Sequence, residues 1–481
     1  MAQARRSDQM VVSFSGIEEK FNGPDRSVQL RWLVGTRVIR RPSSARQSMH
    51  RKPSSARQSM YRKPSTPALY AVSPFQYATS RAFMSPVTKI DDPRERYVIT
   101  AFCYGCNLGP TQTARSIKLA DRRQLSFINQ RHITEQKLNE AIVEVINAYR
   151  NFPLQRLWGL GKTGSADGTK WDLYPQNLMS EYHIRYGGYG GIGYYLIADS
   201  YIALFSRFNT CGSWEGHYIL DFITENDSEV KPDTVHSDTQ GQSEPIFGLA
   251  HLLGIKLMPR IRNWKNLHFY KPDRVAEYKH IGSLFSNEPI DWNLIETMLP
   301  DMLRVALSVK TGKITPSAIL RRLATYSRRN KLYFAFRELG RVVRTMFLLG
   351  YISDVEVRRM ISIATNKSER FNQFADFLLF GSKGVISENV RDEQRKIIKY
   401  NHLVANLVIL HTLVTMSGAL EKMSRQGHVL EPNAVACLSP YQTEYINRFG
   451  SYKLRKGKVV SSLDQAMNIT LFDDVMAPVN S

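Results

Sequence analysis

The chain has 481 residues, with 65 Lys and Arg against 43 Asp and Glu, which gives a formal net charge of +22 and an isoelectric point near 9.8. A hydrophobic content of 43% excludes a chain that is disordered throughout, and four cysteines are too few for a disulfide-stapled scaffold. The basic balance favours a polyanionic partner, with nucleic acid ahead of an anionic membrane surface.

The first 92 residues differ in composition from the rest. The octapeptide Pro-Ser-Ser-Ala-Arg-Gln-Ser-Met begins at Pro42 and again at Pro53, and Pro64 starts a third copy. Proline in every copy forbids a continuous helix, and apolar residues are too few to form a core. We therefore predict a basic, low-complexity and largely disordered segment over residues 1–92.

Helical and strand-like patterns alternate after this segment. Three- and four-residue spacings of apolar residues between 110 and 150 predict helices, within a helical region over 93–160. A turn-rich stretch, 159–168, leads into aromatic and β-branched runs at 194–198 and 201–205, which predict strands. These patterns indicate an α/β core.

The second half of the chain reads mainly as helix. A short strand is predicted at 234–238, and helical patterns begin at Trp292 and continue through 319–351. The longest apolar stretch, 403–416, is shorter than the roughly 20 apolar residues that a bilayer requires. We therefore expect a buried core helix there, no membrane span, and an intracellular, reducing compartment.

Three short motifs carry little weight. Gly161-Lys-Thr resembles the end of a phosphate-binding loop, but Arg156 replaces the first glycine of that loop. The run that starts at Gly188, Gly-Tyr-Gly-Gly-Ile-Gly, matches a dinucleotide fingerprint, yet a glycine-rich hairpin explains it better because strand-like residues follow. Cys103 and Cys106 lack the two further ligands of a structural zinc, so reduced, packed thiols are expected.

Three carboxylates are better candidates for chemistry. Asp167 lies in the turn-rich stretch, Asp238 ends a short strand, and Glu369 lies in a helical stretch. Aspartates near strands and a glutamate on a later helix can hold hard divalent ions such as Mg²⁺, which prefer oxygen ligands. Two such ions stabilise the attacking and leaving oxygens of a phosphoryl transfer. From the residues alone, solvated surface acids remain the better explanation.

Longer stretches change this balance. The chain from about Tyr97 to Leu454 resembles the C-terminal half of the Tn-three family of replicative transposases. The resemblance implies an RNase H-like catalytic region with a DDE triad and Mg²⁺, for which Mn²⁺ can substitute. The stretches that carry it are 104–112, 185–188, 236–243, 257–262, 319–333, 337–349, 366–369 and 438–450.

The resemblance assigns the triad residue by residue. Asp167 in Ser-Ala-Asp-Gly resembles the first aspartate, Asp238 in Ser-Asp-Thr-Gln the second, and Glu369 in Asn-Lys-Ser-Glu the glutamate. All three would be both catalytic and metal-binding. Asp392 and Glu393 remain rivals for the place of the glutamate, because spacing does not show which carboxylate points inward.

The same resemblance sets the expected domains. An RNase H-like DDE domain is expected over 161–400, with a helical insertion at about 285–365, followed by a C-terminal helical region and tail over 401–481. Many relatives have histidine where this chain has Gln240. Family members are longer and begin with DNA-binding domains, so a truncated or rearranged copy is expected.

Basic residues interleave with aromatic ones around 260–265 and 321–333, a mixture that suits phosphate contact and base stacking. Ordinary basic helix faces explain these clusters equally well. The candidate nucleic-acid-binding residues are Arg260, Arg262, Lys265, Arg321, Arg322, Arg328, Arg329 and Lys331.

The function implied by the resemblance is DNA strand cleavage and strand transfer at transposon ends. The expected partner is DNA, both the transposon ends and the target. The expected location is the cytoplasm of a bacterium, in association with the nucleoid. A homodimer is left open. The alternative is an inactive DNA-binding remnant of such a transposase.

Overall fold

The computed structural model describes residues 90, 92–177, 180–184, 187–211, 214–325, 330–444, 446–448, 452 and 454. It also describes two short strands, β1 (Val12–Phe14) and β2 (Thr36–Val38), which pair antiparallel. Apart from these strands and its last residues, the segment predicted to be disordered, 1–92, lies outside the described residues.

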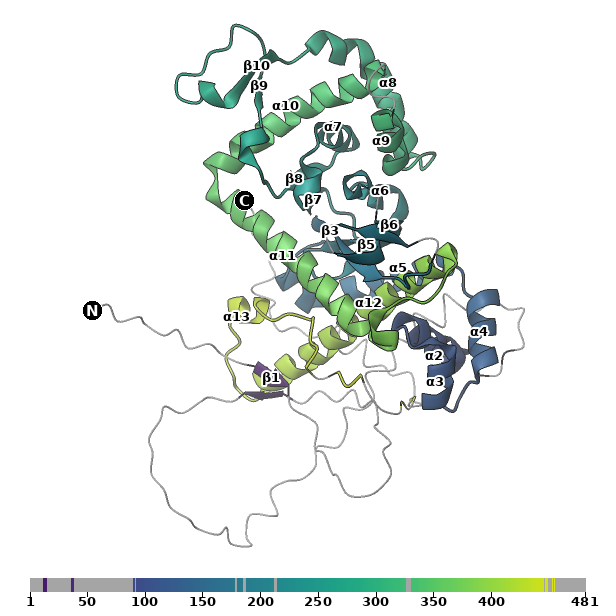
Figure 1. The fold of residues 1–481 in the computed structure, drawn as a ribbon. Helices are drawn as coiled ribbons and strands as arrows, with labels where there is room; N and C mark the ends of the chain where they lie inside the picture. Colours follow the sequence, from purple (N-terminus) through teal and green to yellow (C-terminus); the bar gives the residue numbers. More distant parts are fainter. Residues whose placement is uncertain are drawn as a thin grey trace.

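Within the described residues, a six-stranded mixed sheet forms the centre of the molecule (Figure 1). Its longest strand runs antiparallel to three others, and two short strands extend the sheet beyond one of these as parallel neighbours. The order is β4-β5-β3-β7-β8, with β6 paired to the other edge of β5. The strands are β3 (Thr163–Asp172), β4 (Glu181–His183), β5 (Gly188–Ala198), β6 (Ala203–Thr210), β7 (Thr234–Ser237) and β8 (Lys256–Pro259).

The strands confirm part of the sequence reading and correct part of it. The predicted strand at 194–198 is the second half of β5, and 201–205 overlaps the start of β6. The turn predicted over 159–168 is wrong from Thr163 onward, because that segment is strand β3. Its backbone pairs with β5 on one side and β7 on the other, and this tertiary pairing overrides the weak strand propensity of its glycines and aspartate.

The glycine run that starts at Gly188 forms the first half of strand β5, which pairs antiparallel with β4, so the prediction of a glycine-rich hairpin is confirmed. Close packing explains one of these glycines. A Cβ added at Gly193 would collide with the indole of Trp171, which is buried. The run therefore belongs to the sheet.

Four helices precede the sheet, as predicted for 93–160. The third begins with a capping box, in which Asp121 and Gln124 exchange hydrogen bonds, and the fourth is capped by Thr134. The helices are α2 (Pro93–Gly105), α3 (Gly109–Ser116), α4 (Arg122–Arg131) and α5 (Glu135–Arg150). Cys103 and Cys106 are buried free thiols, as expected.

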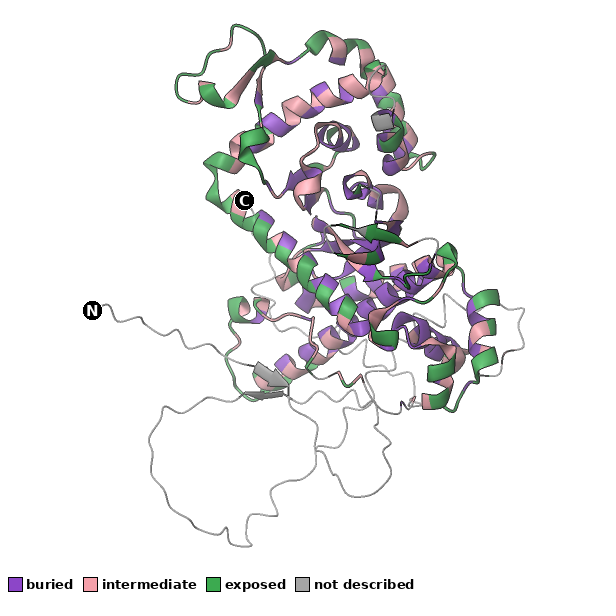
Figure 2. Ribbon diagram, viewed as in Figure 1, coloured by how far each residue is buried: buried purple, intermediate pink, exposed green. Residues whose placement is uncertain are grey.

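Helix α12 (Arg391–Arg425) forms much of the core beneath the sheet, packed against α2, α5 and β6 (Figure 2). It is long and apolar enough to cross a membrane, but 78% of its most apolar window is buried inside the fold. This confirms the prediction of a buried core helix at 403–416. Lys399 and His402 fasten it to the sheet through hydrogen bonds of 2.6 and 2.9 Å to Ser206.

The first helices after the sheet lie at the end of the molecule opposite to α2, α3 and α4, and the helix over 355–378 runs back past the sheet (Figure 1). In sequence, helix α6 (Phe222–Glu225) lies between β6 and β7, and helix α7 (Glu244–Leu253) lies between β7 and β8. A separate two-stranded sheet follows, formed by β9 (Phe269–Lys271) and β10 (Phe285–Pro289). The remaining helices are α8 (Trp292–Lys310), α9 (Pro316–Thr325), α10 (Lys331–Ser353), α11 (Val355–Leu378) and α13 (Pro432–Ala436). These bounds confirm the helical reading from Trp292 onward for the described residues.

Candidate active site

Asp167 lies in β3, and Asp238 directly follows the neighbouring parallel strand β7. The register pairs Ala166 with Ser237, so the residue after each member of this pair is an aspartate. Asp238 directly follows β7, and its Oδ1 accepts a hydrogen bond of 3.0 Å from the Gln240 amide, which starts the 3₁₀ turn η4 (Thr239–Gln242). The prediction that Asp238 ends a short strand is confirmed.

Helix α11 packs on the face of β3 that carries the side chains of Ser165 and Asp167. The hydroxyls of Ser165 and Ser368 lie 3.0 Å apart, and the Asn372 Nδ2 donates a hydrogen bond of 2.9 Å to Asp167 Oδ2. Glu369 lies on this helix beside Ser368, so the helix carries it to the strand ends. Its side chain is 52% exposed and forms an ion pair of 3.2 Å with Arg260.

The rivals for the place of Glu369 lie elsewhere. Asp392 and Glu393 are in the first turn of α12. Glu393 accepts a hydrogen bond of 2.7 Å from Asn129 and pairs with Lys396, whereas Asp392 contacts Arg395 at 3.4 Å. Neither is among the charges that act on Asp167. Of the three candidates, the structure brings Glu369 toward the aspartates.

The electrostatics of Asp167 reflect its neighbours. Burial raises the pKa of its carboxyl group to about 8, and the negative charges of Asp238, Glu215 and Glu369 add to this in decreasing order. A carboxyl group surrounded by like charge retains its proton because ionisation would add repulsion. The site therefore concentrates carboxyl groups around Asp167.

Glu215 is the member of this group that sequence reasoning missed. It starts the 3₁₀ turn η3 (Glu215–Tyr218) and is buried, with 7% of its surface exposed. The turn is tied to the loop after Asp238, because the Gly216 amide donates a hydrogen bond of 3.2 Å to Gln240 Oε1. The Gln240 side chain thus has a structural contact here. No spacing pattern marks Glu215 among the chain's acids.

The donor set fits a hard divalent cation in its chemistry, because it consists of carboxylate oxygens. The buried hydroxyl of Tyr194 has no hydrogen-bond partner among the described residues, and Asp238, Glu215 and Asp167 contribute to raising its pKa. Within the same residues, no group of three or more His, Cys, Asp or Glu side chains is close enough to form a ready metal cluster. The acids are thus gathered around the strand ends without closing on a common point.

The predicted basic residues divide into two groups. Arg260 pairs with Glu369, and Arg262 and Lys265 are exposed just beyond β8. Arg321 and Arg322 are exposed on α9, which packs against η3, and Lys331 is exposed at the start of α10. Arg328 and Arg329 lie outside the described residues.

Arg321 links α9 to the surroundings of the acids. Its charge, after burial, helps to lower the pKa of His217 in η3 to about 4, so the two residues are close. The ring of His217 contacts the edge of Trp214, which is 42% exposed, at a centroid distance of 4.7 Å. An exposed aromatic ring therefore lies beside η3, the turn that bears Glu215 and against which α9 packs.

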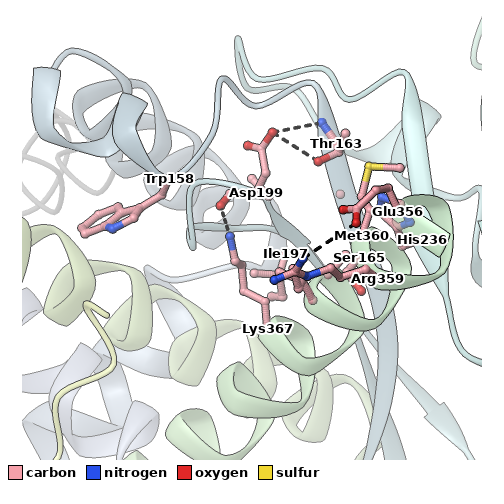
Figure 3. Close-up of a pocket in the computed structure, with 14 residues that line it drawn as sticks. Trp158, Thr163, Ser165, Ile197, Asp199, His236, Glu356, Arg359, Met360 and Lys367 are labelled. Carbon is pink, nitrogen blue, oxygen red and sulfur yellow. Dashed lines mark hydrogen bonds and ion pairs between the residues drawn. The ribbon is translucent and has the colours of Figure 1, made fainter. Parts of the chain in front are cut away.

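A cavity of about 430 Å³ lies between β3 and the first half of α11, away from the acids (Figure 3). Lys367 donates a hydrogen bond to the Asp199 carbonyl across it, and the Asp199 carboxylate accepts one of 2.7 Å from the Gly161 amide. Asp167, Asp238 and Glu369 do not line this cavity. The Gly161-Lys-Thr motif is thus a turn held by an aspartate, in agreement with its rejection as a phosphate loop.

Comparison with known proteins agrees with the resemblance. The family described as Tn3 transposase DDE domain matches residues 78–452. The transposase for transposon Tn1546 of Enterococcus faecium is 30% identical over 77% of this chain and 38% of its own length. Those for Tn3926 of Escherichia coli and Tn501 of Pseudomonas aeruginosa are 31% and 30% identical, over 74% and 73% of this chain and 36% of their own lengths. The chain thus spans less than two fifths of these relatives, and it belongs to the Tn3 transposase family.

Proposed function

We propose that this chain carries the catalytic region of a replicative transposase, which cleaves DNA strands at transposon ends and transfers them to target DNA. The observation that carries the proposal is the pairing of β3 with β7, which sets Asp167 and Asp238 side by side beneath the helix that bears Glu369. The relatives that it matches are named as transposases of transposons.

We assign the catalytic domain to 161–400 and describe it as RNase H-like. In its support, a strand bearing the first aspartate pairs with an antiparallel strand on one side and a parallel strand bearing the second on the other. Helices α8, α9 and α10 then separate the sheet from α11, in agreement with an insertion at about 285–365. The regions 93–160 and 401–481 flank this domain.

Asp167, Asp238 and Glu369 would hold the divalent cation, Mg²⁺ or Mn²⁺. Such an ion supplies activation of water and stabilisation of the charge that develops on phosphate oxygens. The chain's own groups prepare the site. Asn372 orients the Asp167 carboxylate, and Arg260 holds Glu369 at the edge of the site.

The reaction consists of two in-line displacements. First, a water oxygen bonds to the phosphorus at the transposon end and the bond from phosphorus to the 3′ oxygen breaks. The water gives up a proton and the leaving 3′ oxygen takes one up, which yields a free 3′-OH and leaves a 5′-phosphate on the flanking strand. That 3′-OH then attacks a phosphodiester of the target, forms the new strand junction and displaces the target's own 3′ oxygen. Both displacements require the same placement of phosphate beside the carboxylates.

DNA would approach along the basic residues on either side of the acids. Arg260, Arg262 and Lys265 lie at the end of β8, and Arg321 and Arg322 lie on α9. The exposed ring of Trp214 contacts His217 in η3, against which α9 packs, and aromatic rings beside cationic grooves stack on bases. We place this activity in the bacterial cytoplasm, on nucleoid DNA.

A strand-transfer assay with pre-cut transposon ends and Mg²⁺ tests the proposal. The wild-type chain is expected to join ends to target, and Asp167→Asn and Asp238→Asn to abolish joining while DNA binding is retained or strengthened, because less negative charge repels phosphate. Asp392→Asn, on α12, is the matched control and should retain joining. DNA binding without any joining by the wild-type chain would instead identify an inactive remnant.

A further inference from the structure

A fourth carboxylate lies against the strand that bears Asp167. The Oε2 atom of Glu215 rests against the backbone of Gly168, the residue that follows Asp167 in β3. A Cβ at Gly168 would collide with this oxygen, so the absence of a side chain there makes room for the carboxylate. Glu215 therefore reaches the strand that carries the first aspartate from a segment nearly fifty residues later in the chain.

Glu215 is held in this place by its surroundings. The Gly216 amide donates a hydrogen bond to the side chain of Gln240, which lies in the loop after Asp238. A few residues later, Asp221 accepts a hydrogen bond of 2.8 Å from the Ser317 amide at the start of α9 and pairs with Arg207 of β6 at 2.7 Å. The segment that bears Glu215 is thus fastened to β6, to α9 and to the loop of the second aspartate.

Glu369 is placed differently. Its side chain is half exposed and paired with Arg260, whereas Glu215 is buried against β3. Of the two glutamates, Glu215 is the one that the fold fixes against the strand of Asp167.

Tyr194 supplies an independent observation at the same place. It lies opposite Gly168 in the β3–β5 ladder and is 2% exposed, and its hydroxyl has no hydrogen-bond partner among the described residues. Directly opposed residues of an antiparallel pair share a face of the sheet, so the Tyr194 side chain lies on the face where the Glu215 carboxylate meets Gly168. A buried tyrosine hydroxyl ordinarily finds a partner, and water bound to a cation among these acids would provide one.

We propose that Glu215 is a fourth carboxylate ligand of the divalent-cation site, binding the same Mg²⁺ or Mn²⁺ as Asp167 and Asp238. The proposal rests on the proposed function, because it places the ligand in the transposase active site. Four carboxylates would neutralise the charge of two divalent ions, and two such ions stabilise the attacking and leaving oxygens of an in-line displacement. Glu215 provides an oxygen whose position is fixed before DNA binds.

Calorimetric titration of the full chain with Mn²⁺, without DNA, tests the proposal by a readout independent of activity. Glu215→Gln should weaken Mn²⁺ binding by about 10–100-fold, and Glu215→Asp, which keeps the charge on a shorter arm, by less. Glu356→Gln is the matched control, because Glu356 begins the helix that carries Glu369 but is exposed at its far end. It should bind Mn²⁺ as the wild type does.

A second variant moves the carboxylate without removing it. Gly168→Ala places a methyl group where Glu215 Oε2 lies, so it should also weaken Mn²⁺ binding although every acid is still present. Gly350→Ala, at a helical glycine with open space around it, is the control for glycine replacement and should have no effect on Mn²⁺ binding.

The outcomes separate the two proposals. Wild-type Mn²⁺ affinity in Glu215→Gln, together with lost binding in Asp167→Asn, overturns the role of Glu215 and leaves the proposed function standing. Wild-type affinity and strand transfer in Asp167→Asn overturn the proposed site itself. If circular dichroism shows that Glu215→Gln does not fold, Gly168→Ala and Glu215→Asp decide, and wild-type affinity in both overturns the proposal.

Discussion

Asn372 on α11 donates a hydrogen bond of 2.9 Å to Asp167 on β3, although 205 residues separate them in the chain. This bond ties the helix of Glu369 to the strand of the first aspartate. Because helices α8, α9 and α10 intervene in sequence, the position of α11 depends on how they pack. The geometry of the carboxylates is thus set by long-range packing.

Replacing Asn372 tests this tie. Asn372→Ala leaves Asp167 without its donor, so we expect strand transfer to fall by about tenfold, the order of one lost charge-assisted hydrogen bond, with little change in overall fold. Gln373→Ala, at the neighbouring exposed position of α11, is the matched control. Equal rates for both variants and the wild type would show that the bond does not orient Asp167 during the reaction.

The raised pKa of Asp167 predicts how stability depends on pH without divalent metal. The folded carboxyl group keeps its proton up to about pH 8, whereas the unfolded one loses it near its ordinary value of 3.8. The folded state thus binds more protons across this window, and the free energy of unfolding falls as pH rises.

The upper part of this window isolates the effect. Buried histidines with lowered pKa, such as His236, act in the opposite direction but only below their ordinary pKa of 6.5. In EDTA, the melting temperature of the wild type should therefore drop between pH 6.5 and 8, and that of Asp167→Asn should stay nearly level. Added Mg²⁺ should restore the wild type at pH 8 and not the variant. Parallel pH profiles of the two proteins would contradict the assignment.

The sequence predicted elements well where one local pattern dominated. The apolar run of α12 and the short strand that Asp238 follows both stand out in the local order of residues. Strand β3 was not, because Gly-Ser-Ala-Asp-Gly favours turns locally and becomes a strand only through pairing with β5 and β7. Glu215 was missed for a similar reason. Its place is set by Gly168, Gln240 and α9, which no local pattern connects.

Helix α10 packs against α7 through a glycine, and this contact supports the helices between the sheet and α11. A Cβ at Gly340 would collide with the backbone carbonyl of Glu244, an obstacle that side-chain rotation does not relieve. Gly340→Ala should therefore lower the free energy of unfolding by about 1–3 kcal/mol through overpacking. Gly350→Ala in the same helix meets open space and should raise it by about 0.5–1 kcal/mol. Chemical denaturation of both variants measures the difference, and a stable Gly340→Ala would show that the two helices do not approach so closely.

The basic residues of α9 predict a salt-dependent affinity for DNA. If Arg321 and Arg322 neutralise phosphates, log K should fall linearly with log salt, and each replacement by alanine should reduce the slope by about 0.9. Arg304→Ala is the control, because Arg304 is exposed on the neighbouring helix α8 and pairs with Asp301.

Trp214→Ala should weaken binding without changing the slope, since stacking on a base releases no counterion. Titrations of a labelled duplex at several salt concentrations separate these effects. Unchanged slopes for Arg321→Ala and Arg322→Ala would place the DNA path away from α9, and an unchanged affinity for Trp214→Ala would remove its ring from that path.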